Sequence, residues 1–240
     1  MRFSGVLGYP TTPTTDDGGL DFDSFQRLVR GAAAGGLDAV GVLGSSGGFA
    51  YLNRAERADF VRAAVEAAGS TDVAAGVSAP GTREILQHAS DASKAGAAGL
   101  ILSTVSYHPL SDTEVLAPHV AERFSHGMSG DLLIAMSGMG ADGQLADAWH
   151  SGPAALVPEL YLSLRAALES DAALESDAVE TARARLVALL EVIARMPKGS
   201  VLLSLARLTG TVTAAPRSPL LPLTAAEERD LAAAVERAVQ

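Results

Sequence analysis

No cysteine occurs in the 240 residues, which excludes disulfide bonds, thiolate metal sites and a cysteine nucleophile. Aromatic residues make up only 5% of the chain although hydrophobic residues make up 48%. The core must therefore be built from many small contacts between alanine, leucine and valine. Lysine is also scarce, with only Lys94 and Lys198 in the whole chain.

Basic charge and long apolar runs are lacking as well. The 18 lysines and arginines are outnumbered by 28 acidic residues, giving a net charge of −10, so we expect no nucleic-acid partner. No apolar run approaches the roughly 20 residues of a membrane span. The segment Met1–Val6 lacks the apolar region of a signal peptide. Together with the absence of cysteine, this predicts a cytoplasmic protein that does not contact membranes.

The first half of the chain alternates short apolar runs with amphipathic stretches. The runs are apolar throughout, which is typical of strands buried on both faces of a parallel sheet. Repeated β-α units of this kind predict either a TIM barrel or a doubly wound sheet. The predicted strands are Ser4–Tyr9, Ala39–Gly44, Asp72–Ser78 and Gly99–Thr104, and the predicted helices are Asp21–Gly31, Arg54–Ala68 (capped by Asn53), Thr82–Ala95 (capped by Thr82) and Thr113–Ser125.

The second half is less regular. Asp131–Met136 and Ala146–Ser151 are predicted as further strands, and helices are predicted over about 154–170, 176–196, 200–209 and 224–239. A closed barrel of eight strands takes about 250 residues, and too much of this chain is helical to close one. We therefore expect a single domain, with the β-α repeats in residues 1–152 and a late-barrel and helical part in residues 153–240.

Several motifs occur in an order that resembles the dihydrodipicolinate synthase and N-acetylneuraminate lyase family. Thr12-Pro13-Thr14 resembles its opening motif, Gly44-Ser45-Ser46-Gly47-Gly48 its Gly-Thr-Thr-Gly-Glu loop, and Leu52–Arg57 the Leu-Ser-x-x-Glu-Arg that follows. Ser106–Pro109, Asp147–Ser151 and Pro216–Leu220 resemble later segments of the family. The resemblance implies a TIM-barrel (β/α)8-type fold, shortened by one or two β-α units and ending in helices.

The resemblance also implies a site for pyruvate or another 2-keto acid. Ser45 and Ser46 would bind the carboxylate, because hydroxyl and backbone donors converge after a parallel strand. Ser45 and Tyr107 would be the catalytic residues of a proton relay. A tight glycine-rich turn without a ligand is the alternative for the serine pair, and an interface or core tyrosine for Tyr107. Gly48 replaces the acidic residue of the family loop. No histidine and carboxylate grouping has metal-ligand spacing, so no metal and no cofactor are expected.

The stretch between about Phe124 and Asp147 departs from the family pattern. The family has there a Tyr-Asn-x-Pro strand and the strand with its Schiff-base lysine, and both are missing. Lys94 and Lys198 are expected on the surface, away from strand ends. Either the polypeptide is genuinely shortened, or residues of the molecule are missing from this sequence.

Two functions are therefore compatible with the sequence. The first is a family lyase or aldolase that makes or breaks a C–C bond next to a 2-keto acid. The second is a catalytically degenerate member that keeps the fold as a binding or assembly protein. A homodimer or homotetramer is expected in either case.

Overall fold

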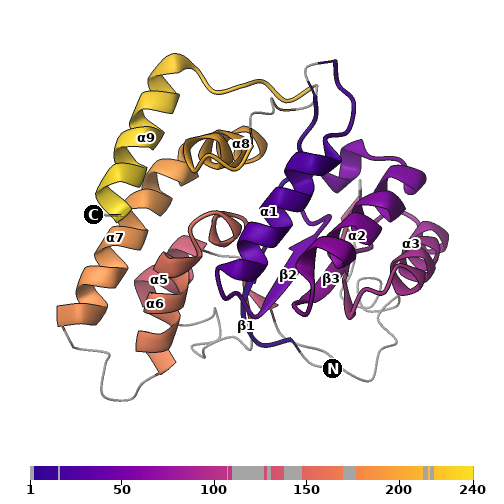
Figure 1. Ribbon diagram of the computed structural model, residues 1–240, viewed down its shortest axis with the longest axis horizontal. Coiled ribbons are helices and arrows are strands. Elements are labelled where there is room, and N and C mark those ends of the chain that lie inside the picture. Colours follow the sequence, from indigo (N-terminus) through magenta and orange to yellow (C-terminus); the bar gives the residue numbers. More distant parts are fainter. Residues whose placement is uncertain are drawn as a thin grey trace.

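The computed structural model describes residues 3–15, 17–106, 108–109, 127–128, 131–137, 148–169, 177–212, 216 and 219–239. Within these ranges the strands form one parallel sheet with helices packed around it (Figure 1). None of the helices in these ranges is both long and apolar enough to cross a membrane.

The sheet has six strands in the order β4-β3-β2-β1-β6-β5. The strands are β1 (Gly5–Gly8), β2 (Ala39–Val42), β3 (Asp72–Gly76), β4 (Gly99–Ile101), β5 (Gly127–Met128) and β6 (Ala148–Ser151). The first strand pairs in parallel with both β2 and the last strand, β6. This adjacency of first and last strands is what a barrel requires, whereas a doubly wound sheet reverses its order near the middle. Within the described residues β4 and β5 are edges, so the sheet is an incomplete barrel.

The helices of the first half confirm the predicted periodicity. They are α1 (Phe22–Ala34), α2 (Arg54–Ala68) and α3 (Thr82–Lys94), each packed against the strand that follows it in the chain. Asn53 caps α2 as predicted: its side chain accepts from the backbone N–H of Glu56, and the Glu56 side chain accepts from the backbone N–H of Asn53. Thr82 is not the cap of α3. Gly81 occupies that position without a side-chain hydrogen bond.

The prediction of a strand over Asp131–Met136 is wrong, because these residues form helix α5 (Asp131–Ser137). A short apolar run does not distinguish a buried strand from a buried helix. Leucine, alanine and methionine are strong helix formers, and an acidic residue in the first turn is favoured by the helix dipole. The nearby two-residue strand β5 was not predicted. The predicted helix Thr113–Ser125 lies outside the described residues.

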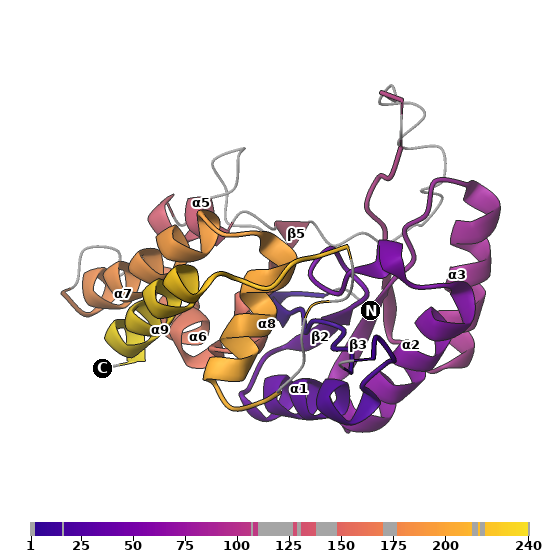
Figure 2. The same cartoon turned by 90° about the horizontal axis from the view of Figure 1, so that it is seen from above.

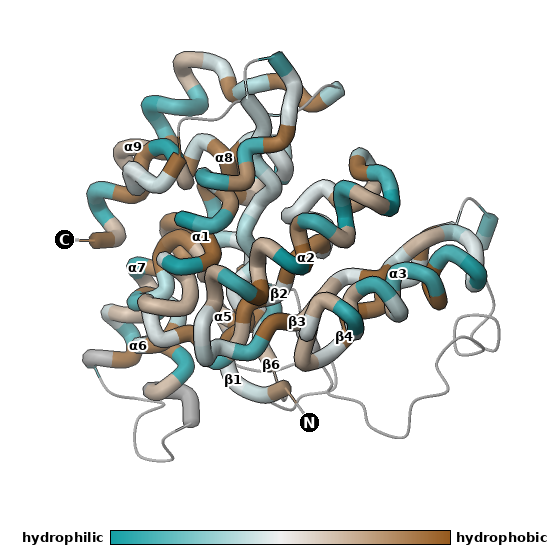
Figure 3. Tube along the Cα trace, turned by 45° about the vertical axis from the view of Figure 1, so that its right-hand side comes forward, coloured by the Kyte–Doolittle hydropathy of each residue, from teal (hydrophilic) through white to brown (hydrophobic). Residues whose placement is uncertain are grey.

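Residues 153–239 are mainly helical, as predicted. The elements are a 3-10 turn (Pro153–Ala155) and the helices α6 (Pro158–Glu169), α7 (Asp177–Ala194), α8 (Lys198–Leu208) and α9 (Ala225–Val239). In Figure 2, α6 to α9 lie beside the sheet on the side opposite α3. Hydrophobic and hydrophilic segments alternate along α2, α3 and α9, as amphipathic helices require (Figure 3). One cluster of buried apolar side chains extends from β1 to α9.

Candidate functional site

The turn that contains the predicted carboxylate site follows β2 directly. Leu43 follows the strand with φ of 59°, a left-handed conformation that is unfavourable for a bulky side chain. Its side chain is buried, with the residue only 1% exposed. The backbone then turns twice, with the Gly47 N–H donating to Gly44 O and the Gly48 N–H donating to Ser45 O. Gly48 has φ of 59°. Glycine adopts this conformation without the cost that a side chain would add.

Two contacts fix this turn at the carboxyl ends of the strands. Thr12, in the loop after β1, donates from Oγ1 to Gly47 O over 2.6 Å. Ser46 lies against the end of β6, since a Cβ added to Gly152 would come within 2.6 Å of Ser46 Oγ. Ser45 is exposed and Ser46 half-buried, and in the described part of the chain neither hydroxyl has a hydrogen-bond partner. The turn therefore presents free hydroxyls where TIM-barrel active sites lie.

A tyrosine and a histidine occupy the inner face of the sheet beside this turn. Tyr9, just after β1, places its hydroxyl 2.6 Å from His150 Nδ1, on β6. Their rings are stacked at 5.5 Å between centroids. Burial raises the pKa of Tyr9 well above its usual value and lowers that of His150, so both side chains are neutral near pH 7. The Tyr9 ring also contacts the backbone of Gly41 and Gly44.

Asp131 is a half-buried carboxylic acid at the start of α5, three residues after β5. Trp149 Nε1 donates to its Oδ1 over 2.9 Å. Burial raises the pKa of Asp131 to about 6, against smaller opposing effects of Ser151, Trp149, Tyr161 and the charge of Lys198. Tyr161 is fully buried, and its hydroxyl has no hydrogen bond of ordinary geometry within the described residues. Its own pKa is raised by burial and by the charge of Asp131.

Neither lysine lies at the end of a strand, as predicted. Lys94 is in the last turn of α3, and Lys198 is the first residue of α8 rather than part of a break between helices. Both side chains are exposed. No amine of a lysine therefore projects from the described strands into the inside of the sheet.

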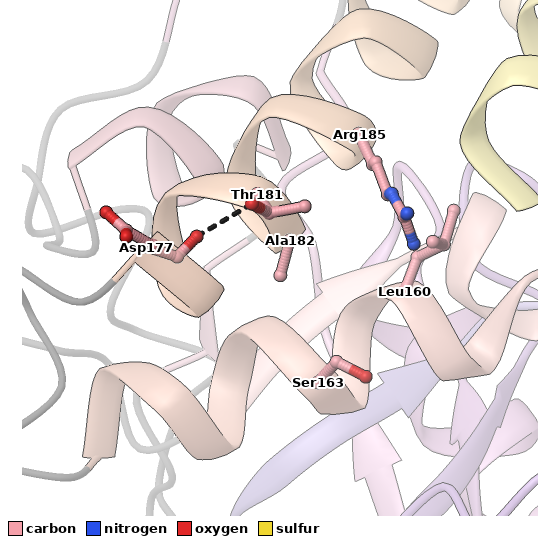
Figure 4. A pocket seen from close by; sticks show the side chains of 6 residues that line it. All are labelled: Leu160, Ser163, Asp177, Thr181, Ala182 and Arg185. Atoms are coloured by element: carbon pink, nitrogen blue, oxygen red, sulfur yellow. Dashed lines mark hydrogen bonds between the residues drawn. The ribbon is translucent and has the colours of Figure 1, made fainter. Parts of the chain in front are cut away.

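A cavity of about 410 Å³ lies away from the strand ends. It is between α6 and α7 and contains no predicted site residue. Figure 4 shows the residues that line it: Leu160, Ser163, Asp177, Thr181, Ala182 and Arg185. Among them, the Thr181 hydroxyl donates to the backbone oxygen of Asp177. Within the described residues there is also no group of three histidine or acidic side chains that could hold a metal.

Of the predicted site residues, the structure places Ser45 and Ser46 on one turn, whereas Tyr107 lies outside the described residues. Sequence reasoning assigned no role to Tyr9, His150 or Asp131. Their common signal is a polar side chain at or just beyond the end of an apolar strand. Of these three residues, only Tyr9 lies at the end of a strand in the first half of the chain, where the strands were predicted correctly. The signal at Asp131 was hidden because its helix was taken for a strand.

Comparisons with known proteins support the family resemblance. Residues 2–122 match the model of the dihydrodipicolinate synthetase family. A 4-hydroxy-tetrahydrodipicolinate synthase from Streptomyces coelicolor is 40% identical over 107 residues, which are 44% of this chain and 36% of that protein. The chain thus matches little more than a third of that relative's length.

Solved structures support the fold over nearly the whole chain. Dihydrodipicolinate synthase from Agrobacterium tumefaciens superposes with a TM-score of 0.82 at 25% identity, covering 99% of this chain and 98% of that one. N-acetylneuraminate lyase from Proteus mirabilis superposes with a TM-score of 0.80 at 18% identity, covering 99% of each chain. The barrel neighbours, the family model over half of the sequence and the strand order agree. The chain belongs to the dihydrodipicolinate synthetase family.

Proposed function

We propose that this protein is a lyase or aldolase of its family that acts on pyruvate or another 2-keto acid. Ser45 and Ser46 would bind the carboxylate of this ligand. The observation that carries the proposal is the position of their turn, at the carboxyl end of β2 and against the end of β6. Hydrogen bonds to a carboxylate are stronger than those between neutral groups, so two hydroxyls and nearby backbone N–H groups suffice for a small anion.

The proton relay remains a proposal from the sequence. Ser45 would pass a proton to or from Tyr107, which follows β4 in the chain. A hydroxyl pair of this kind needs a hydrogen-bonded path to the ligand. The exposed Ser45 hydroxyl, without a partner in the described ranges, is free to form one end of such a path.

The position of the lysines favours a second candidate function, that of a binding or assembly protein. An aldolase that forms an imine needs an amine next to the ketone, and desolvation must lower the pKa of that amine. Lys94 and Lys198 are both exposed on helices. On this proposal the 2-keto acid binds without becoming covalently attached.

Trapping with borohydride separates the two functions. The protein is incubated with pyruvate, reduced, and weighed intact, beside the variants Lys94→Arg and Lys198→Arg. A mass gain of one reduced pyruvyl group that is lost in one variant establishes imine chemistry at that lysine and contradicts the binding protein. An unchanged mass contradicts Schiff-base chemistry for this chain.

Calorimetric titration with pyruvate tests the carboxylate site itself. Removing one hydrogen bond to a charged group costs about 1.5–3 kcal/mol, so Ser46→Ala is expected to weaken binding at least tenfold. Ser163→Ala, on the outer cavity, is the matched control and should bind as the wild type does. Wild-type protein that binds no 2-keto acid would exclude this ligand class.

We also propose that the protein forms a homodimer or homotetramer. Parallel sheets whose edges remain unpaired are prone to associate, and β4 is such an edge in the described part of the chain. Leu86 on α3 and Leu100 on β4 are 65% and 48% exposed. Light scattering that shows a clean monomer at micromolar concentration would contradict the proposal.

A further inference from the structure

The inner face of the curved sheet is lined mainly by small apolar residues. Side chains alternate along each strand, and those that point inward form a cluster separate from the helix-facing core: Leu7, Tyr9, Ala39, Ala74 and Ala148, with Phe3 and Ile101 packed against them. Two glycines, Gly41 and Gly99, also face Tyr9 and Phe3. Among the described strand positions on this face, the polar side chains are Asp72, at the start of β3, and His150 with the adjacent Tyr9 near the carboxyl ends of β6 and β1.

The hydrogen bond between Tyr9 and His150 fixes which imidazole nitrogen carries the hydrogen. A neutral imidazole has one N–H donor and one acceptor nitrogen. Tyr9 is 7% exposed, and His150 Nδ1 is the one hydrogen-bond partner of its hydroxyl in the described ranges. The buried hydroxyl hydrogen needs an acceptor, so it points to Nδ1. The hydrogen of the imidazole is then on Nε2.

This leaves Nε2–H as a free donor. No partner of Nε2 occurs among the residues that the structure describes, and His150 is only half-buried, whereas Tyr9 is buried. Tyr9 therefore holds the ring through Nδ1, and Nε2, on the opposite side of the ring, is the nitrogen that has no partner among the described residues. A neutral imidazole N–H is a good donor to a carbonyl oxygen.

The pair is also tied to the turn that carries Ser45 and Ser46. A Cβ on Gly44, the first residue of that turn, would come within 2.8 Å of the Tyr9 ring. Gly152, two residues after His150, contacts Ser46. The histidine and the serine turn are thus connected through two separate contacts at the same end of the sheet.

We infer that His150 Nε2–H is the donor that recognises the keto oxygen of the ligand, with Tyr9 as the positioning residue that fixes its tautomer. The inference rests on the proposed 2-keto acid site, since the serine turn would bind the carboxylate and His150 the neighbouring carbonyl. It assigns to this chain a way of selecting and polarising a ketone that does not require a lysine.

A comparison of pyruvate with propionate tests the assignment, because propionate has the same carbon skeleton and carboxylate without the keto oxygen. Dissociation constants for both are measured by calorimetry or ligand-observed NMR. One hydrogen bond is worth about tenfold in affinity, so wild-type protein is expected to prefer pyruvate about tenfold.

Two substitutions of His150 separate its nitrogens. Asparagine retains an amide near the position of Nδ1 but provides no donor at Nε2, so His150→Asn should bind both acids equally. Glutamine reaches the position of Nε2 with an N–H, so His150→Gln should restore part of the preference. Tyr9→Phe should reduce the preference and change the 15N shifts of His150 away from the Nε2–H tautomer, whereas Tyr51→Phe, at an exposed tyrosine, should change neither. Thermal unfolding of each variant verifies that it is folded.

The outcomes distinguish this inference from the proposed function. Suppose that Ser46→Ala binds neither acid and that His150→Asn still prefers pyruvate over propionate. This result would support the carboxylate site and overturn the role of His150. A wild-type protein that binds neither acid would overturn both. An Nδ1–H tautomer in the 15N spectrum of the free protein would overturn both the role of Tyr9 and the assignment of Nε2–H as the donor.

Discussion

Replacing Asp131 by asparagine should make the protein more stable at neutral pH. Asp131 is half-buried at the start of α5, and desolvation of its carboxyl raises the pKa from 3.8 to about 6. The folded state therefore favours the protonated acid, and ionisation at higher pH opposes folding. The contribution to stability is fully present below about pH 4 and is lost as the pH rises through about 6.

The size of the effect follows from the shift in pKa. A difference of about two pH units between the folded and unfolded states corresponds to about 3 kcal/mol at pH 7, and to about half of that at pH 5. Asparagine remains neutral throughout and keeps an oxygen that can accept from Trp149 Nε1, which now donates over 2.9 Å. The variant should therefore not lose unfolding free energy as the pH rises, and the Trp149 N–H keeps its hydrogen-bond acceptor.

Urea unfolding from pH 4 to pH 8 provides the measurement. The quantity to compare is the difference in unfolding free energy between Asp131→Asn and wild type, because carboxyls such as Asp91, whose pKa is lowered mainly by its hydrogen bond from Arg54, change stability in the opposite sense in both proteins. The difference should rise by about 2.5 kcal/mol across this range. Asp230→Asn, at an exposed position of α9, is the control. Parallel pH profiles for Asp131→Asn and wild type would refute the reasoning.

Three further substitutions test the packing around the site. Gly41→Ala should destabilise the protein by about 1–3 kcal/mol, because its Cβ would come within 2.3 Å of the Tyr9 ring. Gly31→Ala, with no atom within 4 Å of the new Cβ, should instead stabilise α1 by about 0.5–1 kcal/mol. Denaturant midpoints that shift in the same direction in both variants would contradict this. Arg57→Leu should cost about 3 kcal/mol or more in urea unfolding, since Arg57 is only 5% exposed and its guanidinium donates to two backbone carbonyls at 2.9 and 3.0 Å. A loss under about 1 kcal/mol would count against a structural role. Tyr161→Phe should destabilise the protein by about 1 kcal/mol in urea unfolding, because it removes a buried hydroxyl that interacts with the Asp131 carboxyl, and an unchanged unfolding free energy would count against that interaction.

Local features of the first half could be predicted because they depend on neighbouring residues. The helix Arg54–Ala68 has the bounds that its periodicity indicates, and the side chain of Asn53 caps it. The strands β1 to β4 lie within the predicted runs, each shorter by one or more residues at its ends. The glycines and serines after β2 form the turn that the motif predicts.

The candidate site could be predicted only in part. Ser45 and Ser46 are on one turn, so sequence alone brings them together. Tyr9 and His150 are 141 residues apart, and only the parallel pairing of β1 with β6 places the tyrosine hydroxyl beside the imidazole. The shifted pKa of Asp131 likewise depends on distant residues, Trp149 and Ser151 of β6 and Tyr161 of α6, that act on its carboxyl.

The sequence by itself determined the family, the β-α repeats, the acidic charge and the lack of a lysine at a strand end. Only the tertiary structure decided the order of the strands, the helical state of Asp131–Ser137 and the inward direction of His150. The reason is the range of the interactions. Caps, turns and periodicity act over a few residues, whereas strand adjacency and burial are set by which distant segments exclude water together.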